Sequence, residues 1–237
     1  ITATAPLSAA THGGRAKCLQ RLIRLDLPVP CTVALSFDAV HAIAAGSMPD
    51  MQAILTAFDT DDLLCVRPSS EDPDWGGPRA ILNIGMNDNR YQALRSQLGH
   101  EAAAGLYIRF VQSYAVHVAR LDPDMFDTSA AFGPQELAQA LQAYEAETEE
   151  EFPQDPAVQL AEVLRSMARA WEGVTARLLR QAKGAPVDAK LGLVVQKMAL
   201  SLGQGASGSG VNQAKDAVPR GARAELAGRT RDQSSSS

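Results

Sequence analysis

Apolar residues recur three and four positions apart over several stretches of the chain, a pattern typical of amphipathic helices. The first of these stretches follows the pair Gly13-Gly14. It ends before Pro28, because proline lacks an N–H group and disfavours helix in the residue before it. Further helices are expected over residues 37–45 behind a Ser36 cap, after residue 49, over residues 89–120 and from residue 134 onward.

The clearest helix signal begins at Asp155 and Pro156, which form an N-cap and first-turn pair. The apolar residues that follow alternate four and three positions apart: Leu160, Leu164, Met167, Trp171, Val174 and Leu178. This stripe could belong to a coiled coil. It lasts fewer than three heptads, however, which favours an amphipathic helix packed on its own domain.

Four apolar runs without helical spacing predict strands. They are CTVALS (31–36), LLCV (63–66), ILNIG (81–85) and LGLVVQKMAL (191–200). The second run leads directly into Arg67 and then into a loop rich in Gly, Pro, Ser and Asp. Together the helices and strands predict an α/β protein, of the α+β kind in detail.

Composition excludes several classes of protein. The 237 residues include 27 acidic and 22 basic side chains, and this net charge of −5 argues against nucleic-acid binding. No apolar run reaches the ~18 residues that a membrane span needs. Three widely spaced cysteines argue against a disulfide framework and indicate a reducing cytoplasm. The four histidines lack zinc-site spacing.

Nucleotide motifs are weak on their own. No Walker A motif occurs, and the GxGxxG string at Gly203–Gly208 is not followed by the helix that a Rossmann site requires. The glycine-rich segment from Ser201 reads as a loop or tight hairpin. Residues 212–237 hold almost no large apolar groups and read as a poorly ordered tail.

Two arginines are candidates for anion binding. Arg15 follows a glycine pair at a predicted helix start, where free N–H groups can bind an anion; the alternative is an ordinary turn with a surface arginine. Arg67 follows a buried strand and offers forked donors to phosphate oxygens. Its alternative is a structural ion pair with Glu71 or Asp72.

A third candidate is Gln196, a polar residue between apolar neighbours in the last predicted strand. With the backbone beside it, this side chain could bind the edge of an adenine. The alternative is an amphipathic strand with no ligand.

Five segments, in order along the chain, are HGGRAKCLQRLIRLDLPVP, LLCVRPSS with WGGPRAILNIGMND, YIRFVQSYAVHVARLDPDMFD, EEEFPQDPAVQLAEVLRSMARAWEGVTARLLR and LGLVVQKMALSLGQGASGSGV. Taken together, they resemble the nucleotide-binding domain of the pyruvate, phosphate dikinase family. The resemblance covers roughly residues 13–211. No single segment is decisive, but five collinear ones are specific.

The resemblance implies an ATP-grasp-like, two-lobed nucleotide-binding domain with a helical insert. Residues 1–134 would form the first lobe, 135–182 the insert, 183–211 a second-lobe strand and glycine-rich hairpin, and 212–237 a divergent tail. In the family this domain passes phosphate from ATP to a histidine on a separate domain. The resemblance therefore implies ATP as ligand, a phosphohistidine domain or chain as partner, and no catalytic residue within this chain.

Site residues follow from the resemblance position by position. Arg15 falls where the family has a phosphate-binding lysine, and Arg67 matches a family arginine that contacts the phosphates. Gly76 and Gly77 fall in the flexible loop over the nucleotide. The adenine-lining strand of the family corresponds to Gln196, Lys197 and Met198.

The departures from the family put phosphoryl transfer in doubt. Arg79 is the nearest counterpart of a family aspartate, and Thr175 replaces a family arginine. In the family, the segment after SGTGV supplies the groups that hold magnesium; here the alignment puts Arg229 at an acidic position, and magnesium ligands are not found.

Three hypotheses follow. The first is an ATP-binding phosphotransferase module. The second is a degenerate, non-catalytic nucleotide-binding or regulatory protein. The third is a helical interaction scaffold without a ligand, which surface positions for Arg15 and Arg67 would favour.

Overall fold

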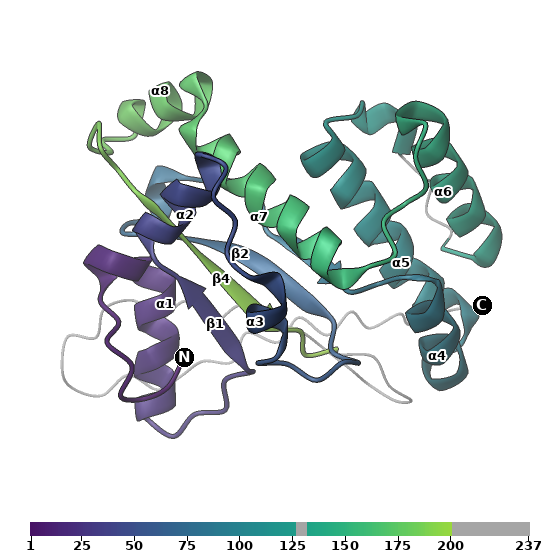
Figure 1. The fold of residues 1–237 in the computed structure, drawn as a ribbon, viewed down its shortest axis with the longest axis horizontal. Coiled ribbons are helices and arrows are strands. Elements are labelled where there is room, and N and C mark those ends of the chain that lie inside the picture. The colour runs from purple at the N-terminus through teal and green to yellow at the C-terminus, as the bar shows by residue number, and fades with distance from the viewer. Residues whose placement is uncertain (127–131, 201–237) are drawn as a thin grey trace, which may run out of the picture. The chain divides into compact units, whose positions relative to one another are not determined.

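A computed structural model describes residues 1–126 and 132–200, and residues 1–199 form one compact unit (Figure 1). The strands are β1 (Thr32–Leu35), β2 (Leu64–Ser70), β3 (Ile81–Ile84) and β4 (Leu191–Lys197). The α-helices are α1 (Ala9–Arg24), α2 (Phe37–Ala44), α3 (Met51–Leu55), α4 (Asp88–Leu98), α5 (His100–Tyr114), α6 (Pro134–Thr148), α7 (Pro156–Glu172) and α8 (Val174–Ala182). Shorter turns are the 3-10 helices η1 (Pro73–Trp75) and η3 (Pro123–Phe126) and the π-helical η2 (Ala115–Ala119). This mixture of helices with a small antiparallel sheet agrees with the predicted α+β class.

The sheet has the order β1-β4-β2-β3, with antiparallel neighbours throughout. β4 follows the other three strands in the chain but lies between β1 and β2. Its residue Gln196 is directly opposite Thr32 on one side and Cys65 on the other. The strand that the resemblance assigns to a second lobe therefore shares one sheet with strands of the first.

The two faces of the sheet differ in polarity, because successive strand residues point to opposite sides. α2 and α7 cover an apolar face, on which Leu64, Val66, Leu193 and Val195 are buried (Figure 1). The other face, against which α1 packs, carries a more polar set: Cys65, Arg67, Ser69, Thr32 and Gln196.

Helices α4, α5 and α6 pack beside the sheet around an aromatic cluster centred on Phe152. The Phe152 ring centroid lies 5.2 Å from that of Tyr144 and 5.3 Å from that of Tyr114. It lies 5.5 Å from Phe110 and 5.9 Å from Tyr107, in edge-to-face geometry that aromatic pairs favour. Phe152 thus joins α5 and α6 to the segment that leads into α7.

Two helix caps predicted from the sequence are confirmed. The Ser36 hydroxyl accepts a hydrogen bond from the Ala39 N–H and caps α2. Asp155 caps α7 in the same way through the Ala157 N–H, with Pro156 in the first turn.

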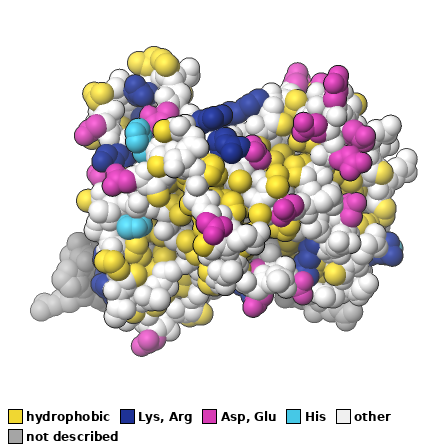
Figure 2. Space-filling view, viewed as in Figure 1, with side chains coloured by type: hydrophobic (Ala, Val, Ile, Leu, Met, Phe, Trp, Pro, Cys, Tyr) yellow, Lys and Arg dark blue, Asp and Glu magenta, His cyan; other side chains and the backbone are white. Residues whose placement is uncertain are grey.

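The apolar stripe predicted from Leu160 to Leu178 ends earlier than expected. Trp171 is buried, but the helix breaks at Gly173, and Val174 and Leu178 lie on α8 with 73% and 60% of their surface exposed. Figure 2 shows hydrophobic side chains exposed over α8. The chain changes direction at Gly173, so the stripe does not continue along one helix axis.

Two boundaries also differ from the predictions. α1 begins at Ala9 rather than after the glycine pair, and Gly13 is a non-helical break inside it. β2 continues beyond Val66 to Ser70, so Arg67 lies within the strand rather than at its end. Pro68 is tolerated there because it lies past the last β2–β3 pair, where no neighbouring strand needs its N–H.

The predicted glycine-rich segment from Ser201 and the predicted tail at 212–237 lie outside the described residues, as does Arg229. Within the described ranges, no helix combines the length and the hydropathy that crossing a bilayer would require.

Candidate functional site

Gly13, the break within α1, lies directly against β2. Its backbone is left-handed, with φ +83° and ψ 167°, and a Cβ atom there would lie 1.9 Å from the Ser69 carbonyl oxygen. The Ser69 hydroxyl donates to the His12 carbonyl (2.7 Å) and accepts from the Ala16 N–H (3.1 Å). Ser69 therefore holds the helix start on the polar face of the sheet.

Arg15 and Arg67 meet at this junction. The Arg15 Nε donates a 2.8 Å hydrogen bond to the carbonyl of Pro68, the residue next to Arg67. Burial lowers the pKa of Arg15, and the positive charge of Arg67 lowers it further. Burial raises the pKa of the nearby Cys65 thiol, an effect that both arginines oppose. Arg15 thus lies close enough to Arg67 for the two charges to interact, although about fifty residues separate them in sequence.

No carboxylate neutralises this pair among residues 1–126 and 132–200. Neither Arg15 nor Arg67 forms an ion pair there, so the predicted alternative partners of Arg67, Glu71 and Asp72, do not pair with it. Both arginines are half-buried. Two like charges at one junction repel each other, and a bound anion would offset that cost.

Gln196 lies on the same face of the sheet as Arg67. It is buried, directly opposite Cys65, and its side-chain amide donates to the Thr32 hydroxyl at 2.9 Å. The structure therefore groups three of the predicted site residues, Arg15, Arg67 and Gln196, on one face.

The next two predicted residues have other contacts. Lys197 points to the opposite face, where its Nζ lies 2.6 Å from an Asp62 carboxylate oxygen and 3.4 Å from one of Asp59. The hydrogen bond to Asp62 raises the pKa of Lys197. Met198 follows the end of β4, where its N–H donates to the Leu63 carbonyl and its sulfur accepts from the Asn83 N–H.

The predicted glycine loop lies on the α7 side of the sheet. Gly76 is left-handed, with φ +82°, and ends η1. A Cβ on Gly77 would lie 3.5 Å from the Pro68 side chain and 3.6 Å from the Trp171 ring. Because Pro68 and Arg67 point to opposite faces, this loop does not join the Arg15–Arg67 group directly.

Sequence reasoning missed the roles of Ser69 and Cys65. Both stand two positions from Arg67 in β2, so the alternation of a strand puts all three on one face. This alternation was not recognised because the strand was expected to end at Val66, whereas it continues to Ser70.

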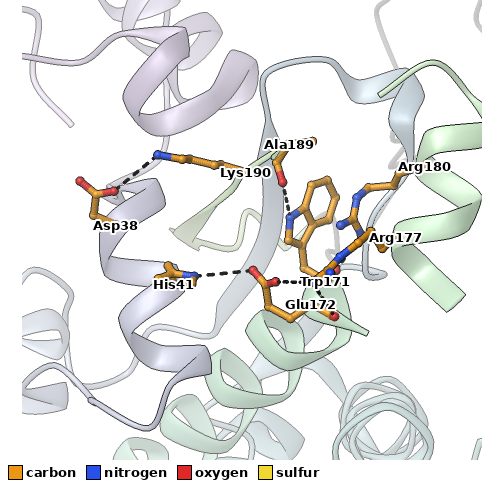
Figure 3. Close-up of polar contacts among 8 residues, drawn as sticks. All are labelled: Asp38, His41, Trp171, Glu172, Arg177, Arg180, Ala189 and Lys190. Carbon is orange, nitrogen blue, oxygen red and sulfur yellow. Dashed lines mark hydrogen bonds and ion pairs between the residues drawn. The ribbon is translucent and has the colours of Figure 1, made fainter. Parts of the chain in front are cut away.

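A separate pocket of about 390 Å³ lies between α2, α7, α8 and the segment that enters β4. Polar side chains on its rim pair with each other (Figure 3): Asp38 with Lys190 at 3.9 Å, His41 with Glu172 at 3.8 Å, and Glu172 with Arg177 at 3.4 Å. No residue of the predicted site lines this pocket.

Trp171 anchors the wall of this pocket. Its indole N–H donates to the Ala189 carbonyl at 3.0 Å, and the Arg180 guanidinium stacks 3.6 Å above its ring (Figure 3). Arg180 also donates to the Trp171 carbonyl at 2.7 Å. These contacts fasten α8 and the entry to β4 onto α7.

Metal ligands are not grouped in the part of the chain that the structure describes. No three His, Cys, Asp or Glu side chains there are placed to share an ion.

The chain is similar to two curated proteins named pyruvate, phosphate dikinase. The one from Clostridium symbiosum is 30% identical over 174 residues, which cover 65% of this chain and 20% of that protein. The one from Rhizobium meliloti (strain 1021) is 27% identical over 239 residues, which cover 84% of this chain and 26% of that protein. No family model matches the chain. The matched part spans only about a fifth to a quarter of these relatives, and over it the chain has a weak relationship to pyruvate, phosphate dikinases that suggests a phosphotransferase-related function.

Proposed function

We propose that this chain binds an adenine nucleotide and serves as the nucleotide-binding part of a phosphotransferase related to pyruvate, phosphate dikinase. The observation that carries the proposal is the meeting of Arg15 and Arg67 on one face of the sheet, without a carboxylate partner among the described residues. The similarity to the two dikinases supports the same reading.

The proposed phosphate site follows from the chemistry of these groups. Each guanidinium offers a planar set of N–H donors that matches phosphate oxygens, and a bound phosphate would offset the repulsion between the two cations. Gly13 and Gly14 face backbone carbonyls of Ser69 and Glu71, so the donors of the proposed site are the two guanidinium groups.

The proposed adenine site uses the end of β4. Gln196 is already on the phosphate side, and its amide can donate to and accept from a base edge if it leaves the Thr32 hydroxyl. Lys197 and Met198 would contribute only backbone carbonyls, because their N–H groups donate to the Cys31 and Leu63 carbonyls. Gly76 and Gly77 lie on the α7 side of the sheet, so the proposed site does not include them.

The wider assignment is also a proposal. It includes an ATP-grasp-like fold with two lobes, and transfer of phosphate from ATP toward a histidine on another domain or chain. Magnesium would supply charge neutralisation for that transfer. The described residues give no acidic cluster to hold it, so we assign this chain nucleotide binding and no metal step.

Calorimetric titration with ATP tests the proposal, first in magnesium and then in chelator. Arg67→Ala should weaken ATP binding roughly tenfold or more, because a charge-assisted hydrogen bond to phosphate is lost. Arg21→Ala is the matched control, since this exposed arginine lies on α1 beyond the junction with β2. Equal affinities of the Arg67→Ala and unmodified chains, or no binding at all, would overturn the proposal.

The magnesium arm separates the two nucleotide hypotheses. Tighter binding in magnesium than in chelator would support a phosphotransferase module. An ATP affinity that is the same in magnesium and in chelator would support a degenerate, non-catalytic nucleotide-binding protein.

A further inference from the structure

A second, smaller pocket of about 130 Å³ lies where the Gly76–Arg79 loop passes η2 and α7. Its polar lining comes from three separate segments: Arg79 before β3, His117 and Arg120 around η2, and Ser166 of α7. Ile81 and Met167 contribute to its apolar lining.

This pocket is distinct from the Arg15–Arg67 junction. Ile81 is directly opposite Val66 in the sheet, so its side chain shares the apolar face covered by α7. Arg67 is the next residue after Val66 and therefore points to the other face. The two arginine groups lie on opposite sides of the sheet.

The backbone at this pocket is unusual. After α5, residues Ala115–Ala119 form a π-helical turn that ends at Arg120, whose backbone is left-handed with φ +65° and ψ 31°. Ser166 of α7 contacts two residues of this turn. Its hydroxyl donates to the His117 carbonyl at 2.6 Å and accepts from Arg120 Nη2 at 3.4 Å. Such π-turns and left-handed non-glycine residues are costly, and they recur at functional sites.

The charge in the pocket is of one sign. Arg79, Arg120 and His117 are its titratable lining residues, and no Asp or Glu lines it. Neither arginine forms an ion pair with any residue the structure describes. Burial lowers the pKa of His117, and the charges of Arg79 and Arg120 lower it further, in keeping with their positions around one pocket.

We propose that this pocket binds a phosphate group, with Arg79 and Arg120 as the charged donors and the His117 ring as a third. Its volume of about 130 Å³ is several times the ~10–15 Å³ that one water needs by the same measure, enough for one tetrahedral oxyanion. The paired guanidinium groups provide forked donors of the kind that phosphate favours. The Ser166 hydroxyl positions the donors and does not donate itself, because its proton is directed to the His117 carbonyl.

The ligand can be free phosphate or the phosphate group of a small phosphorylated molecule, because both present the same oxyanion. Parallel titrations with inorganic phosphate and with AMP distinguish the two sources. Tighter binding of AMP that depends on Arg79 and Arg120 assigns the pocket to a phosphorylated small molecule. Equal or tighter binding of inorganic phosphate with the same dependence assigns it to free phosphate.

The test follows the imidazole resonances by NMR during the phosphate titration, with His117→Asn used to assign the His117 signal. We expect phosphate to shift that signal and to raise the pKa of His117, because a bound anion opposes the effect of the two arginines. Arg79→Ala and Arg120→Ala should each weaken binding roughly tenfold or more, and Arg79→Lys should weaken it less. Arg95→Ala is the control, an exposed arginine on α4 that does not line the pocket.

Three results would overturn the proposal. The first is a phosphate affinity that neither Arg79→Ala nor Arg120→Ala changes. The second is an equal His117 shift in sodium chloride of the same ionic strength. The third is loss of the His117 shift in Arg15→Ala, because that would place the bound phosphate at the other arginine pair and would leave the proposed nucleotide site intact.

Discussion

At the scale of single residues, Gly13 makes the α1–β2 junction possible. Its left-handed backbone interrupts α1, and the absence of a side chain lets the Ser69 carbonyl approach to a distance that a Cβ atom would forbid. The same close approach allows Ser69 to bond both His12 and Ala16. Two residues after Gly13, Arg15 donates to the Pro68 carbonyl from the same junction.

Gly13→Ala should therefore destabilise the protein more than backbone strain alone explains. Gly184 is the matched control: its φ is +84°, against +83° for Gly13, but a Cβ there would meet nothing within 4 Å. Gly184→Ala should cost about 1–2 kcal/mol for the left-handed backbone. Gly13→Ala should cost roughly 3 kcal/mol or more, since the helix must also move away from β2. Urea unfolding measures both free energies, and similar losses for the two variants would contradict the close contact.

At the scale of elements, α7 joins the sheet to the rest of the unit. The residues it buries include Leu160, Leu164, Met167 and Trp171, and Trp171 is only 2% exposed. The helix ends where the chain reaches Gly173, and α8 then presents Leu178 to solvent. Residues that share one apolar spacing in sequence thus belong to two helices, and they are buried on α7 but exposed on α8.

Trp171→Ala should lower the free energy of unfolding by about 3–5 kcal/mol, as truncation of a buried aromatic side chain does. The loss includes the hydrogen bond to Ala189 and the stacking with Arg180. Leu178→Ala, from the same spacing in sequence, should change it by less than about 0.5 kcal/mol because Leu178 is exposed. Thermal and denaturant unfolding of both variants check this contrast; a large loss for Leu178→Ala would mean that α8 is buried in solution.

At the scale of the whole described unit, Gln159 connects distant segments. This fully buried side chain accepts from the Gly85 N–H at 2.8 Å and donates to the carbonyls of Met86 (2.8 Å) and Pro153 (2.7 Å). It thereby ties α7 to the turn after β3 and to the segment after α6. A buried polar side chain with all its bonds satisfied fixes one arrangement of these elements.

Gln159→Leu should cost about 2–5 kcal/mol, because it keeps the side chain's bulk but removes the partner of three buried or part-buried backbone groups. Gln92→Leu, at an exposed position of α4, should change stability by less than about 0.5 kcal/mol. Hydrogen exchange offers a second measurement, since the Gly85 amide should lose protection in Gln159→Leu before the β2–β4 amides do. Unchanged stability would show that water replaces the lost bonds.

The sequence alone was enough for most of the local structure. The caps at Ser36 and Asp155 and the four apolar strands are encoded within a few residues, because capping, proline geometry and periodicity act over one or two turns. The polar run after Val66 was misleading: it suggested a loop, whereas pairing with β4 keeps Arg67 to Ser70 extended.

The arrangement of these elements was decided only by tertiary structure. An apolar run such as β4 predicts a buried strand, but its position between β1 and β2 depends on long-range pairing that local pattern does not encode. That pairing places Gln196 on the same face as Arg67 and sends Lys197 to Asp62 on the other. Likewise, the contact of Arg15 with the Pro68 carbonyl and the common pocket of Arg79 and Arg120 follow from which faces the helices cover. The sequence therefore singled out Arg15 and Arg67 as candidates, whereas only the packing of helices on the sheet brought Arg79, His117 and Arg120 to one pocket.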